Sequence, residues 1–146
     1  MEVIGDTSKA RLIAAFIDHL LAFALMLLIL ALIPEESALL TGLLFFTAYL
    51  AYYVILEAVW SRTVGKYFQG LVVRKLDGSP CDVKAALLRG VTRIIEVNPL
   101  LFGGLPAGLV IISTQRKQRV GDILAGTVVV AAGTRWGVGF DPGVAT

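Results

Sequence analysis

The sequence predicts an all-α membrane protein built on a transmembrane helical hairpin, and three observations point to this fold class. Hydrophobic residues make up 57% of the 146 residues and charged residues only 16%, and the mean hydropathy is +0.81. Two long apolar runs follow one another with a short polar break between them. Lysine and arginine lie in the connections and are absent from both runs. Because soluble domains carry about 25% charged residues, this pattern indicates that lipid is the solvent for much of the chain.

The two apolar runs predict the two helices of the hairpin. The first covers residues 12–33, and its only strongly polar residues are Asp18 and His19. At about 1.5 Å per residue, a helix of this length crosses a hydrocarbon core of about 30 Å. It is too long for the apolar region of a signal peptide, so we expect a retained helix. The second run covers residues 38–60 with the single charge Glu57. The short PEES break makes the two helices antiparallel neighbours.

The placement of basic residues predicts the orientation of the hairpin. Lys9 and Arg11 precede the first helix, Arg62 and Lys66 follow the second, and the connection between the helices has no basic residue. Cytoplasmic segments carry an excess of lysine and arginine. We therefore expect a multi-pass protein of the plasma (inner) membrane with a cytoplasmic N-terminus.

Two short segments after the hairpin predict a small cytoplasmic β element. Residues 70–76 are rich in β-branched side chains and are followed by an Asp-Gly turn signal. Residues 127–130 form a second β-branched run within an apolar stretch too short to cross a membrane. The two runs can pair only if both lie on the same side of the bilayer.

Between these runs, residues 82–96 predict an amphipathic helix lying in the membrane interface. Its apolar side chains recur at helical spacing on one face, and its basic side chains lie off that face. The apolar positions are Val83, Leu87, Val91 and Ile94 or Ile95, and the basic positions are Lys84, Arg89 and Arg93.

Residues 97–114 form a third apolar segment, which is broken by Pro99, Pro106 and several glycines. A full crossing would place the basic cluster that follows it outside, whereas a re-entrant segment keeps that cluster cytoplasmic. The sequence allows both, and the charge rule favours re-entry. The glycine-rich residues 134–146 are expected to form a flexible tail, so residues 1–133 make up the membrane domain.

Polar side chains within the hairpin predict a functional or structural constellation. Arg11 and Asp18 are seven residues apart and share one face of the first helix. Tyr49, Tyr53 and Glu57 follow one another at i+4 spacing on the second helix. An ionisable group in lipid costs about 2.5–3.5 kcal/mol even on the insertion scale, so such groups normally face partners. We expect the hairpin to bring them together in the inner leaflet.

Two interpretations of this constellation stay open, and they are compatible. In the first, Arg11, or Arg89 or Arg93 from the interfacial helix, neutralises Asp18 and Glu57 and locks the fold. In the second, Asp18 and Glu57 form a cation or proton site, because two carboxylates at low dielectric repel each other and one of them can retain an exchangeable proton.

Other features of the sequence narrow the class of function. Arg116, Lys117 and Arg119 are expected to contact anionic lipid headgroups rather than nucleic acid. Tyr52 is expected to be a helix-packing aromatic. The sequence has no phosphate loop, no Cys/His set with metal-ligand spacing and no nucleophile with a base, and Cys81 is its only cysteine. We therefore expect no enzyme, no metal and no cofactor.

Four ordered motifs resemble the RDD family of membrane proteins, named for an arginine and two aspartates. They are RLIAAFIDHLL, TVGKYFQGLVV, ALLRGVTRII and QRVGDILAGTVVV, which together span residues from about 10 to 131. The resemblance implies that Arg11, Asp18 and Asp122 are the signature residues, supported by Gly65, Lys66, Gly70, Arg89, Gly126 and Thr127. It also implies three membrane helices. Family members are described as possible transporters, with sodium/proton exchange attributed to some, while others resemble accessory subunits of membrane assemblies.

These features lead to three functional hypotheses. The first is cation/proton exchange with Asp18 and Glu57 as the ion-handling pair. Because two spanning helices enclose too little volume for a pathway, such an exchanger would be a homo-oligomer. The second is a non-transporting accessory or scaffold subunit of a larger membrane complex. The third is a lipid-binding membrane protein. In each case Asp122, just beyond the basic cluster, is expected to bridge Arg89 or Arg93.

Overall fold

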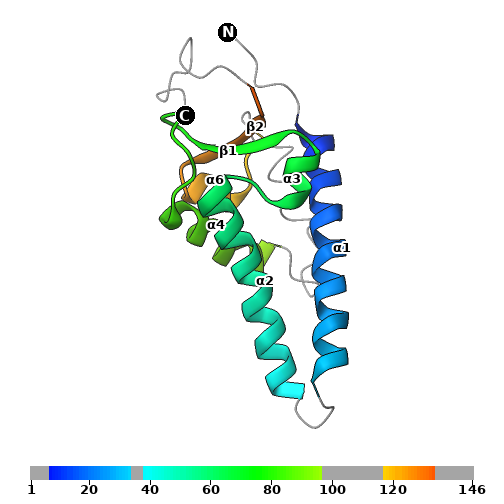
Figure 1. Ribbon diagram of the computed structural model, residues 1–146. Coiled ribbons are helices and arrows are strands. Elements are labelled where there is room, and N and C mark those ends of the chain that lie inside the picture. The colour runs from blue at the N-terminus through cyan, green and yellow to red at the C-terminus, as the bar shows by residue number, and fades with distance from the viewer. Residues whose placement is uncertain (1–6, 34–37, 97–116, 134–146) are drawn as a thin grey trace.

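The computed structural model describes residues 7–33, 38–96 and 117–133. The predicted third apolar segment and the predicted C-terminal tail lie outside these ranges. The described chain is mostly helical with one small sheet (Figure 1). In chain order the elements are α1 (Ser8–Leu32), α2 (Ala38–Trp60), α3 (Val64–Phe68), β1 (Leu71–Lys75), α4 (Val83–Glu96), α6 (Val120–Leu124) and β2 (Thr127–Ala131).

α1 and α2 run antiparallel, as the short connection predicts (Figure 1). Both are long and apolar enough to cross a membrane, and few of their residues are buried. Leu12, Leu32 and Leu39 are each more than 70% exposed. A core helix of a soluble protein would bury such side chains. α2 has the predicted bounds, whereas α1 begins four residues before the predicted start because the helix continues through the polar residues before Leu12.

The short helix α3 fills the space beside α1 at the end of the hairpin near the sheet (Figure 1). Thr63 caps it by accepting a hydrogen bond from the Lys66 N–H at 3.4 Å. Gly65 allows α3 to approach α1 closely, because a Cβ there would lie 2.1 Å from the carbonyl oxygen of Ala14. α1 therefore packs more extensively against α3 than against α2.

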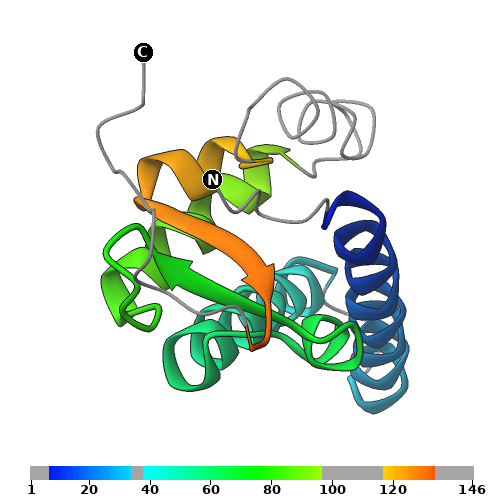
Figure 2. The ribbon, with the colours of Figure 1, turned by 90° about the horizontal axis from the view of Figure 1, so that it is seen from above.

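β1 and β2 form an antiparallel pair that lies across the end of the helical hairpin (Figure 2). The register runs from Leu71 opposite Ala131 to Lys75 opposite Thr127, which confirms the predicted pairing of the two β-branched runs. The apolar core lies between this sheet and its neighbouring helices. It contains Ala14, Leu71, Val73, Cys81, Ala85, Ala86 and Val129.

α4 is the predicted amphipathic helix, and its polar face is turned toward the protein. Arg89 and Arg93 are buried, whereas Val83 and Ile95 are at least 60% exposed. The contact with α2 is close at Gly90, where an added Cβ would lie 2.8 Å from a methyl group of Val54. The predicted apolar stripe is thus the outer face of α4. The arginines point inward, where they bind carboxylates of other elements.

Candidate functional site

Asp122, at the start of α6, lies at the centre of a buried network of charged side chains and is fully inaccessible. Its Oδ2 accepts a hydrogen bond from Nη2 of Arg11 at 2.7 Å and from the backbone N–H of Arg119 at 3.1 Å. Its Oδ1 accepts from Arg89 Nη1. Burial alone would raise the pKa of Asp122, but Arg89, Arg119 and Arg11 lower that pKa well below its usual value. The carboxylate therefore stays ionised.

Glu57, in the last turn of α2, is the second carboxylate of the network. Its Oε2 accepts from Nε of Arg89 at 2.6 Å, and its Oε1 contacts Nζ of Lys66. Nη2 of Arg93 lies 3.8 Å from the same Oε1. Both oxygens of Glu57 are thus engaged by cationic groups.

Arg89 of α4 joins the two carboxylates. Nε binds Glu57, and Nη1 binds Asp122 and also donates to the Thr127 hydroxyl at 2.8 Å. Burial opposes the charge of Arg89, but Asp122 and Glu57 outweigh this effect and raise its pKa above the ordinary value. Arg89 is 1% exposed. A single guanidinium therefore connects α2, α4, α6 and β2.

Lys66 of α3 is the one lysine in this network. Its side chain is 9% exposed and contacts Glu57. Burial lowers the pKa of Lys66 to about 7, because the attraction of Glu57 is offset by the positive charges of Arg89, Arg93 and Arg119. Lys66 is therefore the member of the network that titrates near neutral pH.

Arg93 and Arg119 complete the network. The guanidinium of Arg93 lies 3.7 Å from the centre of the Tyr53 ring. Nη1 of Arg119 lies 3.8 Å from Oε2 of Glu96, whose Oε1 accepts a hydrogen bond from the Gly121 N–H. Burial and the neighbouring Arg93 lower the pKa of Arg119 to about 10.

The predicted headgroup contact of Arg119 does not fit this position. Arg119 is 7% exposed, because Glu96 and Asp122 draw its side chain inward. Lys117 is half-buried, and its carbonyl oxygen accepts a hydrogen bond from Arg11. Arg116 lies outside the described residues. The basic cluster is thus partly built into the protein and does not form a uniformly exposed surface.

Asp18 of α1 has a different environment, made of neutral donors. Its Oδ1 accepts from the Tyr52 hydroxyl at 2.7 Å and the Gly65 N–H at 2.8 Å, and its Oδ2 accepts from the Thr63 hydroxyl at 2.6 Å. No lysine or arginine in the described ranges forms an ion pair with Asp18. The expectation that an arginine neutralises Asp18 is therefore wrong, because Tyr52 of α2 and the segment that follows α2 supply neutral donors instead.

The structure brings most of the predicted site residues together. Six of them belong to the charge network, namely Arg11, Tyr53, Glu57, Arg89, Arg93 and Asp122, and Asp18 lies at the adjacent neutral site. Tyr52 was expected to pack only, yet its hydroxyl binds Asp18. Thr63 and Glu96 were not predicted. The spacing of Glu96 could have indicated its role. It follows Arg89 by seven residues and Arg93 by three, and so lies on the same face of α4.

The chemistry of this site is limited, because the carboxylate oxygens of Glu57 and Asp122 already bind cationic groups. Glu57 and Asp122 present no free oxygen without the loss of an ion pair. Among the residues described, no group of three or more His, Cys, Asp or Glu side chains could hold a metal ion. The arrangement is suited to joining segments by charge.

Two exposed apolar helices joined at one end by a buried charge network fit a membrane protein. The RDD family matches the chain over residues 8–126, so the chain belongs to the RDD family. This match confirms the resemblance found in the four sequence motifs. No curated protein and no solved structure is a significant match to the chain.

Proposed function

We propose that this RDD protein is a non-transporting accessory or scaffold subunit of a membrane complex. In this proposal α1 and α2 span the plasma membrane, the N-terminus is cytoplasmic, and the charge network lies at the cytoplasmic end. The distribution of basic residues supports the orientation, since Lys9 and Arg62 lie at the two ends nearest the sheet. The exposed apolar surface of both helices supports the insertion.

The main support for the proposal is that the carboxylate oxygens of Glu57 and Asp122 all bind cationic groups already. A cation such as sodium needs several oxygen ligands, and the oxygens of both carboxylates are already bound by Arg89 and by Lys66 or Arg11. Five buried cationic groups, Arg11, Lys66, Arg89, Arg93 and Arg119, lie among four buried carboxylates, Asp18, Glu57, Glu96 and Asp122. This excess of positive charge repels a further cation. Such a network suits a fixed platform for a partner better than an ion pathway.

Cation/proton exchange by a homo-oligomer is the second candidate, and Lys66 favours it. The pKa of about 7 means that Lys66 loses its proton near neutral pH, and its contact with Glu57 then loses its charge. A cation can take the place of the lost charge beside Glu57. In this mechanism Glu57 and Asp18 handle the ion, and Lys66 carries the exchanged proton.

Flux measurements on the purified protein separate the two candidates. The protein is reconstituted in liposomes, and proton movement is followed with a pH-sensitive dye after addition of sodium or lithium. We expect no flux above that of protein-free liposomes, and we expect co-purification with a larger membrane complex from mild detergent. Sodium-dependent flux that is lost in Asp18→Asn and Glu57→Gln, and retained in the exposed-site control Lys84→Gln, would overturn the accessory role.

Insertion and orientation need a separate test. Membranes are washed with alkaline carbonate, and an N-terminal tag is exposed to protease in sealed right-side-out and inverted vesicles. We expect the protein to remain in the membrane and the tag to be cleaved only in inverted vesicles. Release by carbonate would refute insertion, and cleavage in right-side-out vesicles would refute the orientation.

A further inference from the structure

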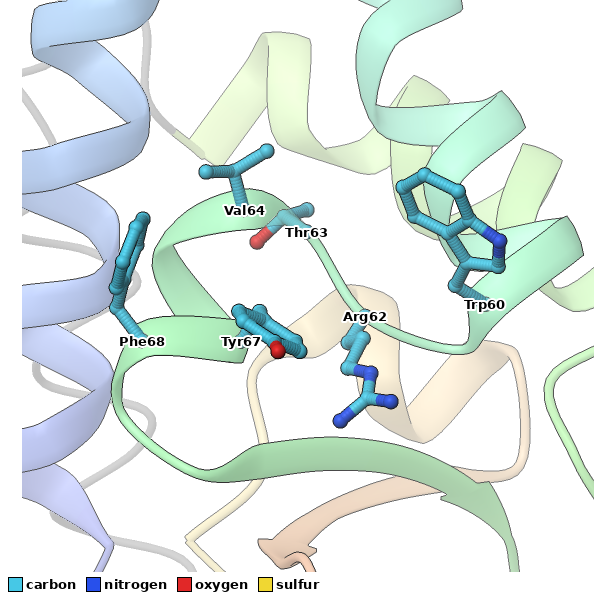
Figure 3. Close-up of a pocket in the computed structure, with 6 residues that line it drawn as sticks. All are labelled: Trp60, Arg62, Thr63, Val64, Tyr67 and Phe68. Carbon is cyan, nitrogen blue, oxygen red and sulfur yellow. The ribbon is translucent and has the colours of Figure 1, made fainter.

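Two neighbouring cavities lie where α2 ends and α3 begins, outside the charge network. The first has a volume of about 380 Å³ and is lined mainly by apolar atoms. Figure 3 shows Trp60 on the side of α2 and Phe68 on the side of α1, with Val64 and Tyr67 of α3 between them. Ligand cavities in proteins begin at about 300 Å³, so this one has room for a segment of an apolar molecule.

The second cavity, of about 370 Å³, is lined mainly by polar atoms. It lies on the side of the sheet, with Val72 and Arg74 of β1 among its lining residues. Trp60 and Arg62 line both cavities, so the two are adjacent. An apolar compartment and a polar compartment with a shared wall match the two halves of an amphipathic ligand.

The charge of the polar cavity indicates the sign of that ligand. Arg62 and Arg74 both line it, and neither forms an ion pair with a carboxylate in the described ranges. The guanidinium of Arg62 lies 5.0 Å from the centre of the Tyr67 ring, and Figure 3 shows it pointing toward β1. In contrast, every arginine of the buried network lies within 4 Å of a carboxylate oxygen. A phosphate would complement this pair of arginines.

We propose that the two cavities form one site for an anionic glycerophospholipid. A segment of one acyl chain lies in the apolar cavity beside Trp60 and Phe68, and the phosphate lies in the polar cavity near Arg62 and Arg74. Trp60 and Tyr67 are 62% and 61% exposed, as suits aromatic side chains at the level of the headgroups. This inference rests on the proposed membrane insertion, since only an inserted hairpin meets the lipid at that depth.

Native mass spectrometry with added lipid tests the proposal. The full chain in detergent is titrated with phosphatidylglycerol and, separately, with phosphatidylcholine of the same acyl composition. We expect preferential retention of phosphatidylglycerol. The double variant Arg62→Gln/Arg74→Gln is expected to lose about tenfold or more in affinity for phosphatidylglycerol, because each arginine near an anionic lipid contributes roughly fivefold. Affinity for phosphatidylcholine should change little.

A charge-matched control separates a built site from general attraction. Lys9→Gln/Lys84→Gln removes two exposed positive charges elsewhere and should keep the preference for phosphatidylglycerol. Equal retention of phosphatidylglycerol by wild type and Arg62→Gln/Arg74→Gln would overturn the proposal. Equal retention of both lipids by the wild type would also overturn it. An unfolded double variant would be recognised by its melting curve, and Arg62→Lys/Arg74→Lys would then replace it, with a retained preference expected.

Fluorescence in vesicles provides a second, independent measurement. Trp136→Phe leaves Trp60 as the only tryptophan of the chain. We expect brominated phosphatidylglycerol to quench Trp60 more than brominated phosphatidylcholine does, in vesicles containing equal amounts of each lipid. Equal quenching by both would refute the site while leaving insertion intact, whereas a protein released by carbonate and not quenched by either would refute insertion itself.

Discussion

Replacement of Arg89 by methionine should be among the most destabilising single changes in this protein. Arg89→Met keeps much of the side-chain volume but removes the donors that bind Glu57 at 2.6 Å, Thr127 at 2.8 Å and Asp122. Both carboxylates then remain buried with fewer compensating charges. Breaking a buried ion pair from one side costs about 3–5 kcal/mol.

The loss is measurable as a shift of the thermal midpoint in detergent. For a chain of this size, about 1 kcal/mol corresponds to roughly 2–4 °C, so we expect Arg89→Met to melt about 10 °C or more below the wild type. Arg89→Lys should recover part of the loss, since an ammonium keeps the charge but cannot reach both carboxylates as the guanidinium does. Lys84→Met, on the exposed side of the same helix, serves as the matched control and should change the midpoint little. A midpoint for Arg89→Met equal to that of the control would refute the structural role of the network.

Three further predictions concern Gly65, Lys66 and Cys81. Gly65→Ala should destabilise the protein strongly, because its Cβ would lie 2.1 Å from the Ala14 carbonyl oxygen. Gly42→Ala in α2 is the control: its Cβ meets nothing within 4 Å, so the thermal midpoint should be unchanged or higher. The free energy of unfolding should rise between pH 7 and pH 9. In the folded protein the pKa of Lys66 is about 7, against an ordinary value of 10.5, so the unfolded chain binds more protons in this range. The rise should be absent in Lys66→Met, and an equal rise in that variant would contradict the assignment. Cys81 is 2% exposed, and burial raises the pKa of its thiol to about 11. It should therefore react with a maleimide at pH 7 only after denaturation. Rapid labelling of the folded protein would contradict its burial.

Periodicity and composition were enough to predict the long elements. The second helix has the predicted bounds, because an apolar run between a PEES break and a basic segment allows no other placement. The strand pairing was predicted from two β-branched runs, and the structure confirms it with Val73 opposite Val129. Asp122 was expected near Arg89 or Arg93 from its sequence position and binds Arg89.

The environment of Asp18 could not be predicted in the same way. Its three donors come from a second helix and from the turn that leads into a five-residue helix, which is too short to carry a periodic signal. Whether Asp18 meets an arginine or a hydroxyl depends on where the chain after Trp60 returns, which is a matter of tertiary packing. The amphipathic pattern of α4 alone does not reveal which of its two faces the protein covers, and only the expected ion pairs of Arg89 with Glu57 and Asp122 indicated its inward direction.

A double-mutant cycle between Arg11 and Asp122 tests the central claim most directly. These residues belong to α1 and α6, are 111 positions apart in sequence, and meet at 2.7 Å. The cycle compares the free energies of unfolding of Arg11→Met, Asp122→Asn and the double variant. A buried contact of this kind predicts a coupling energy of about 1 kcal/mol or more, within the range of 0.5–3 kcal/mol for residues that share a network. Additive effects of the two substitutions would show that the network does not hold these segments together.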